Sequence, residues 1–221
     1  GELLDDSIAP TGYIIREPAK GGKYLDLSQV DFEALRRQFE KGRKRTEAEI
    51  LRGQINSKII QMMRLNRTRM DYYQKFQKMI EDYNTGAKNV DAFFTELVSL
   101  AQSLTQEEKR GISENLSEEE LTLFDILTKP AVKLSNKEKV QVKAVASELL
   151  DTLKAERLVL DWRKRQQSRA AVQLEIETML DRLPETYDKD LYDQKCQQVY
   201  QHVYDSYYGA GRSIYVIKTR T

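Results

Sequence analysis

Residues 135–153 read SNKEKVQVKAVASELLDTL, and this stretch decides the fold class. It opens with a capping box, Ser135-x-x-Glu138, in which the Ser oxygen accepts from the third helical N–H and the Glu side chain accepts from the Ser N–H. Apolar residues then recur three and four positions apart, which places on one side of a helix Val142, Val145, Ala146, Leu149, Leu150 and Leu153. The stretch therefore predicts an amphipathic helix that packs against a core.

The same signals recur along the chain. Further capping boxes begin at Thr46, Thr105 and Ser117, and the 221 residues include only 10 Gly and 4 Pro. We expect helices from Ser28 to Gly42, over Val90–Ser103, after Thr105, Ser117 and Ser135, over Leu158–Leu183 and from Asp188 to Tyr208. The stretch from Thr46 to about Asn84 forms either two helices or one helix whose middle leaves the core, because its apolar positions are interrupted by Asn66 and Arg69. This pattern predicts an all-α fold, a multi-helix bundle-like domain.

The first 27 residues follow a different pattern. Two short β-prone runs, Tyr13–Ile15 and Lys23–Leu27, flank Pro18 and the Gly21-Gly22 pair. This pattern fits a short β-hairpin or an irregular lead-in segment, and the sequence leaves both open. The helical domain then spans residues 28–221, with sub-bundles at 28–129 and 131–221 on either side of Pro130.

The composition excludes several classes of protein. No apolar run approaches the roughly 20 residues that span a bilayer, so we expect no membrane contact. The first 30 residues lack the pattern of a signal peptide, so we expect a cytoplasmic location. One cysteine, Cys196, and one histidine, His202, exclude an internal disulfide, a Cys-based zinc cage and a multi-His metal site.

The charge is segregated although the formal net charge is only +1. Residues 36–78 contain 13 Lys or Arg and 4 Asp or Glu, whereas residues 81–128 contain 3 and 11. The two stretches either neutralise each other by packing together or present separate faces to different partners. We favour neutralisation, because neighbouring helices of opposite charge are common.

A search for catalytic patterns yields none. Gly21-Gly22-Lys23 lacks the first glycine of a phosphate loop, and Tyr24 follows where that loop has Ser or Thr. Cys196 and His202 are six residues apart on one predicted helix, about 240° around its axis, so they form no catalytic dyad. Two acidic-x-Lys triplets resemble nuclease motifs but fall on predicted helices rather than strands: Glu107-x-Lys109 and Asp193-x-Lys195. We therefore predict no catalytic, cofactor or metal site in this chain.

Two basic clusters remain, and each interrupts an apolar seam. Asn66 and Arg69 stand at the positions that would continue the apolar stripe between Met62 and Tyr73. Residues 163–169 interrupt the stripe between Trp162 and Val172 in the same way. Such clusters either form a solvated or salt-bridged helix face or contact DNA phosphates or an acidic patch on a partner. The candidate contact residues of the first cluster are Arg64, Arg67 and Arg69, with an upstream cluster of Arg43, Lys44 and Arg45. Those of the second cluster are Arg163, Lys164, Arg165 and Arg169.

Large apolar and aromatic residues of the C-terminal third are expected in the core. Trp162 follows Leu158 in the apolar stripe that precedes Val172 and Ile176. A tyrosine series with helical spacing ends at Tyr207, and core packing explains it better than stacking on nucleic-acid bases.

Several strings resemble one known family. DWRKRQQSRAAV at residues 161–172 and VYQHVYD at 199–205 are similar to the C-terminal part of the R (restriction) subunit of type I restriction–modification enzymes. The segment that begins with Asp26-Leu27-Ser28 and the Tyr83-Asn84-x-Gly86 motif also resemble that family. The resemblance covers nearly the whole chain.

The resemblance implies a function and a set of partners. The full R subunit is a type I site-specific deoxyribonuclease that translocates DNA with ATP and Mg²⁺, and its catalytic domains precede the helical C-terminus. This chain would then be a non-catalytic domain without a cofactor of its own, linking the motor to the methyltransferase core of modification and specificity subunits. The alternative is a DNA-contacting domain that guides the duplex near the motor.

Overall fold

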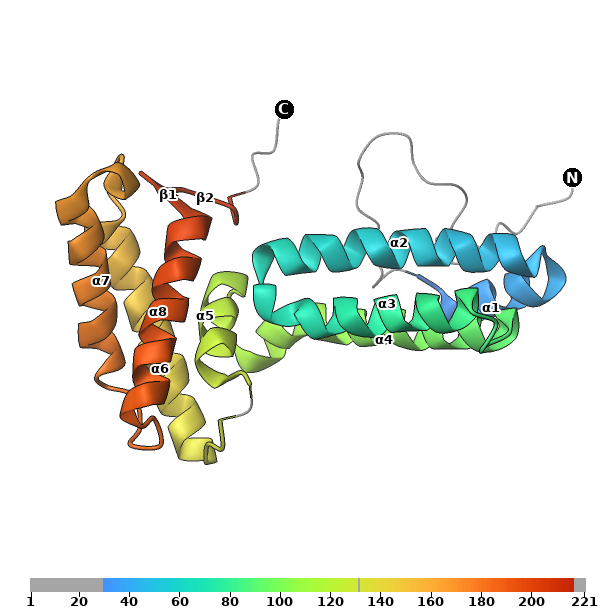
Figure 1. The fold of residues 1–221 in the computed structure, drawn as a ribbon, viewed down its shortest axis with the longest axis horizontal. Coiled ribbons are helices and arrows are strands. Elements are labelled where there is room, and N and C mark those ends of the chain that lie inside the picture. Colours follow the sequence, from blue (N-terminus) through green and yellow to red (C-terminus); the bar gives the residue numbers. More distant parts are fainter. Residues whose placement is uncertain (1–29, 131, 217–221) are drawn as a thin grey trace, which may run out of the picture. The chain divides into compact units, whose positions relative to one another are not determined.

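The computed structural model describes residues 30–130 and 132–216, which are mostly helical (Figure 1). These residues form two compact units: the first comprises residues up to 63 and 69–110, and the second comprises 64–68 and the residues from 111 onward. The predicted all-α character is confirmed for the described residues, apart from one small hairpin. The proposed N-terminal hairpin or irregular segment of 1–27 lies outside the described residues, and the sub-bundles 28–129 and 131–221 stay a prediction.

The first unit is built from α1 (Phe32–Lys41), α2 (Lys44–Leu65), α3 (Met70–Asn84) and α4 (Val90–Glu114). Helices α2, α3 and α4 run side by side in Figure 1. Their apolar stripes meet in a core that includes Leu51, Ile55, Ile59, Phe76, Phe93 and Leu97. Stacked rings join α1 to α4 and α3 to α4, with centroid distances of 3.8 Å for Phe39–Phe94 and 4.3 Å for Tyr83–Phe93.

The second unit is built from α5 (Glu118–Thr128), α6 (Asn136–Thr152), α7 (Gln166–Leu180) and α8 (Lys189–Ser206). The apolar side of α6 is buried as the opening stretch predicts, with Val142, Val145, Ala146, Leu149, Leu150 and Leu153 in the core. Leu121 and Leu127 of α5, Ile176 of α7 and Val199 of α8 complete this core.

Half of the predicted capping boxes form. Ser117 caps α5 and Ser135 caps α6, and in both boxes the reciprocal Glu bond is present. Asn89 accepts from the N–H of Ala92 at the start of α4, and Asp188 accepts from that of Leu191 at the start of α8.

The predicted helix starts at Thr46 and Thr105 are wrong. Helix α2 begins two residues earlier, at Lys44, and Thr105 lies inside α4, where its hydroxyl donates to the carbonyl of Ala101. The buried stripe of α4 continues through Leu104, so packing favours helix across the apparent start signal. Helix α4 ends instead at Asn115, whose positive φ of 55° gives the left-handed cap conformation.

The stretch 158–183 is not one helix, contrary to the prediction. A π-helical turn, Leu153–Arg157, follows α6, and a 3₁₀ turn, Trp162–Lys164, precedes α7. Asp161 between them has a φ of 58°. This bent connection turns the Trp162 ring into the core, where its Nε1 donates to the carbonyl of Tyr207 (3.1 Å).

The last helix is two residues shorter than predicted, and a hairpin replaces its end. Strand β1 (Tyr207–Gly209) pairs antiparallel with β2 (Arg212–Ser213). Gly209 has a φ of +86°, and a Cβ built on it would lie 2.2 Å from the carbonyl oxygen of Val159. The hairpin therefore packs backbone to backbone against the α6–α7 connection, a contact that only glycine at this position allows.

Within the described ranges no helix is both long enough and apolar enough to cross a bilayer.

Trp162 is confirmed as a core residue, since its side chain is fully buried. We expect Trp162→Ala to lower the free energy of unfolding by about 3–5 kcal/mol, because it leaves a cavity and removes the indole bond to Tyr207. Urea denaturation followed by circular dichroism measures this loss. The wild-type fluorescence maximum should be blue-shifted, and a red-shifted maximum with unchanged stability would contradict the assignment.

Candidate interaction surfaces

The turn between α2 and α3 is built around a buried amide. Asn66 is fully buried, and its Nδ2 donates to Oδ2 of the equally buried Asp125 (2.8 Å). Its Oδ1 accepts from the backbone N–H (3.1 Å) and the hydroxyl (2.7 Å) of Thr68. The Lys129 ammonium lies 3.4 Å from the same Asp125 oxygen. The polar interruption at Asn66 is therefore an internal contact, whereas the sequence suggests a stretch that projects beyond the core.

Arg69, one of the candidate contact residues, is also buried, and its charge is paired inside the fold. Its Nε donates to Glu107 Oε1 (3.0 Å), and the Arg69 side chain is 3% exposed. Arg110 lies 3.1 Å from the same Glu107 oxygen. A buried guanidinium needs a carboxylate beside it, and α4 supplies that carboxylate.

Arg64 and Arg67 are exposed and stay candidates for contact. Arg67 lies 3.1 Å from Asp205, but its side chain is 75% exposed, so this pair contributes little to stability. Arg64 forms no ion pair with the residues that the structure describes.

The upstream cluster lies where α1 meets α2. Lys44 pairs with Asp91 and lies 5.4 Å from the centre of the Phe39 ring. Arg43 and Arg45 are exposed and form no ion pair within the described ranges. Two further exposed cations of α1, Arg37 and Lys41, have the same character. We call these four free cations the α1–α2 basic turn: Arg37, Lys41, Arg43 and Arg45.

The segregated charges of the first unit partly neutralise each other, as the favoured interpretation predicts. Three ion pairs join the basic stretch 36–78 to the acidic stretch 81–128: Lys44–Asp91, Lys58–Glu108 and Arg69–Glu107. The cations of the α1–α2 basic turn stand outside these pairs.

The second cluster is divided between structural and exposed cations. Arg163 donates to the carbonyl of Tyr204 (2.7 Å), and its guanidinium lies over the Tyr204 and Tyr208 rings at 5.3 and 4.7 Å. Arg169 donates to the carbonyl of Arg163 (2.8 Å). Lys164 and Arg165 are exposed, and Lys164 pairs with Asp161 (3.0 Å). Two of the four cations therefore hold the connection together, and two face solvent.

The acidic-x-Lys triplets have structural roles. Glu107 holds Arg69, as described above. Lys195 is buried, and its ammonium donates to the carbonyls of Ile126 (2.7 Å) and Lys129 (2.5 Å), which places a positive charge at the C-terminal end of α5. Among residues 30–130 and 132–216, no group of three His, Cys, Asp or Glu side chains is placed to hold a metal ion.

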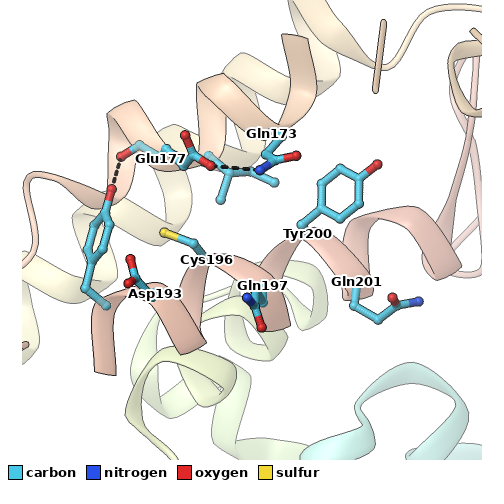
Figure 2. A pocket seen from close by; sticks show the side chains of 9 residues that line it. Gln173, Glu177, Asp193, Cys196, Gln197, Tyr200 and Gln201 are labelled. Carbon is cyan, nitrogen blue, oxygen red and sulfur yellow. Dashed lines mark hydrogen bonds between the residues drawn. The ribbon is translucent and has the colours of Figure 1, made fainter. Parts of the chain in front are cut away.

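A groove of about 650 Å³ lies between α7 and α8, and Figure 2 shows its lining. Cys196 points into it, flanked by Glu177, Asp193 and Gln197. Burial raises the pKa of the Cys196 thiol, which keeps it protonated at neutral pH. A protonated thiol beside carboxylates and amides offers no activated nucleophile.

His202 provides no base for Cys196, because both of its ring nitrogens have other partners. Nδ1 lies 3.3 Å from the Ser206 hydroxyl, and Nε2 lies 3.2 Å from the Tyr215 hydroxyl. The Tyr215 hydroxyl donates to the carbonyl of Leu65 (2.7 Å), so the network assigns the proton to Nε2 of a neutral ring. Burial above all, together with the nearby charge of Arg67, lowers the pKa of His202 to about 4, and the charge of Asp205 opposes this shift.

The comparisons with known proteins agree with the resemblance seen in the sequence. A family model described as "Type I restriction enzyme HindI endonuclease subunit-like, C-terminal" matches residues 1–207. The chain belongs to this family. No curated protein and no solved structure matches the chain significantly.

In this restriction-subunit domain, the sequence analysis missed one group of surface residues. Val159, Leu160, Tyr208 and Arg212 were assigned to helices or passed over, yet all four are exposed next to the second cluster. The signal was present in Gly209-Ala210-Gly211, which predicts a tight turn after a helix and not only a helix end.

The two kinds of arginine in the first cluster should respond differently to charge reversal. We expect Arg69→Glu to lower the free energy of unfolding by about 3–5 kcal/mol, because it places two carboxylates together in a buried site. Arg64→Glu, the matched control, should change it by less than about 0.5 kcal/mol. Urea denaturation compares the two variants, and equal effects would contradict the assignment of Arg69 to the interior.

His202 should make stability depend on pH. The unfolded ring binds a proton below about pH 6.5, whereas the folded ring stays neutral down to about pH 4. Stability is therefore complete above 6.5 and falls as the pH decreases, by roughly 2 kcal/mol between pH 7.5 and 5. His202→Gln should lack this decrease, since the chain contains no other histidine. Denaturant titrations at several pH values test it, and an equal decrease in the variant would refute it.

Proposed function

We propose that this chain is a non-catalytic assembly domain that links the motor and nuclease of a type I restriction endonuclease subunit to the methyltransferase core. The observation that carries the proposal is the family match over residues 1–207. The partners follow from it: modification and specificity subunits, with DNA reached through the complex.

The surroundings of the side chains that could take part in catalysis support a role in binding over one in catalysis. The only cysteine has a buried thiol with a raised pKa, and the only histidine is neutral and held by two hydroxyl groups. The acidic-x-Lys triplets hold other parts of the fold. The exposed residues include cations and large apolar side chains. Such side chains suit a surface that binds a partner.

The α1–α2 basic turn favours a second candidate function, contact with DNA. Arg37, Lys41, Arg43 and Arg45 are exposed, and within the described ranges no carboxylate neutralises them. Free cations of this kind suit a run of phosphates, whose neutralisation releases counterions. The domain would then guide the duplex near the motor.

The test measures binding of the chain to a purified complex of modification and specificity subunits by isothermal titration calorimetry, with and without a DNA duplex. We expect saturable binding without DNA. We also expect no ATP hydrolysis and no cleavage of plasmid DNA with Mg²⁺. Failure to bind the core, or turnover that scales with the amount of this chain, would refute the proposal.

DNA contact is distinguished by its salt dependence. If the basic turn binds phosphates, Arg43→Glu/Arg45→Glu should weaken duplex binding and reduce the slope of log affinity against log salt by about 0.9 per lost contact. Lys137→Glu/Lys139→Glu, on the exposed first turn of α6, is the control with the same number of reversed charges. Unchanged duplex binding in the double variant would exclude the basic turn as the DNA surface.

A further inference from the structure

The α6–α7 connection and the C-terminal hairpin form one continuous surface at one end of the second unit. The N–H of Ala210 donates to the carbonyl of Leu158 (3.0 Å), and Gly209 packs on the carbonyl of Val159. Arg163 of the connection lies over the Tyr208 ring of the hairpin. Figure 1 shows β1 and β2 at the end of the unit where α6 passes into α7. We call this the connection–hairpin surface.

The centre of this surface is apolar and exposed. Val159 is 48% exposed, Leu160 is 59% exposed and Tyr208 is 38% exposed. These large side chains lie on two neighbouring segments. They stay exposed to solvent even though the core of the second unit lies next to them. Burying them against a partner removes apolar area from water, and Tyr and Arg are residue types enriched among those that dominate binding.

Cations surround this centre. Lys164, Arg165 and Arg212 are exposed, and Asp161 is the carboxylate among them. The ion pair with Lys164 lowers the pKa of Asp161 most, and the charges of Arg165 and Arg212 lower it further. The surface therefore carries an excess of positive charge around its apolar side chains.

The backbone beneath the surface is held in place before any partner binds. Trp162 anchors the connection to Tyr207, and Arg163 and Arg169 bridge it internally. Asp161 and Ala210 both have positive φ values, which the surrounding contacts maintain. Such a surface loses little conformational freedom on binding, which favours affinity.

We propose that the connection–hairpin surface docks on a protein face of the methyltransferase core that has an apolar centre and Asp or Glu side chains around it. This inference rests on the proposed function and names the surface that performs it. Duplex DNA fits the surface less well, because phosphates gain nothing from Val159 and Leu160. Among the described residues, no large apolar side chain between 30 and 59 is exposed, and the α1–α2 basic turn lies in this range, so it is the better surface for DNA.

The apolar centre is tested with matched double variants. Val159→Ser/Leu160→Ser alters the proposed surface, and Val140→Ser/Leu174→Ser alters residues of the same types on α6 and α7 that are 67% and 64% exposed. We expect the first variant to weaken binding to the methyltransferase core at least tenfold and the second less than twofold. Circular dichroism and thermal midpoints check that both variants fold as the wild type does.

The cationic rim is tested by charge reversal in the same way. Arg165→Glu/Arg212→Glu should weaken core binding about tenfold at low salt, with a smaller effect at high salt. Lys137→Glu/Lys139→Glu, on the exposed first turn of α6, is the control and should have little effect.

The outcomes separate this inference from the proposed function. If the wild-type chain binds the core but both surface variants bind equally well, the inference fails and the proposed function stands. If the wild-type chain does not bind the core, both fail. If the surface variants lose binding to a labelled DNA duplex but keep binding to the core, DNA is the occupant and the inference is wrong.

Discussion

The amide of Asn66 and the carboxylate of Asp125 are both fully buried, and the course of the chain between α2 and α3 depends on their 2.8 Å bond. A buried polar group costs free energy unless it has a partner, and here each side chain is a partner of the other, with Thr68 and Lys129 as further partners. The bond holds residues 64–68 in the second unit, while α2 and α3 on either side belong to the first. One polar pair thus fixes the point where the apolar seam is interrupted.

The same constraint governs the other polar interruptions. Arg69 meets Glu107 in the interior of the first unit, and Arg163 and Arg169 donate to backbone carbonyls around Trp162. A long helix with an apolar seam could run straight through such a position only if the polar side chain pointed to solvent. Where the side chain is buried instead, the helix ends and the chain bends, so that the polar group lies next to a hydrogen-bonding or charged partner. The break between α2 and α3 shows this behaviour, and in the α6–α7 connection the half-buried Arg163 and Arg169 likewise have partners inside the fold.

Local signals predicted much of the fold, left the break between α2 and α3 as one of two alternatives, and missed the bend between α6 and α7. The boxes at Ser117 and Ser135 and the stripe of α6 were read correctly, because capping and 3.6-residue periodicity are local properties. The Thr105 box failed because the buried stripe of α4 continued past it. The burial of Arg69 depends on Glu107, 38 residues away, and the turn at Trp162 depends on the carbonyl of Tyr207, 45 residues away. Sequence spacing carries no information on such partners, so the candidate contact residues could not be divided from the sequence into exposed and internally bonded cations.

The separation of structural from exposed cations gives the basic clusters their functional meaning. An arginine that holds a carbonyl or a buried carboxylate is committed to the fold, and its replacement reports on stability alone. The cations that remain fall into two groups of different surroundings: the α1–α2 basic turn lies among polar residues, whereas Lys164, Arg165 and Arg212 border exposed Val159, Leu160 and Tyr208. Phosphates and proteins differ in what they gain from aliphatic neighbours, because only a protein partner can bury them in an apolar contact. The two groups therefore suit different classes of partner, and one small domain has room for both.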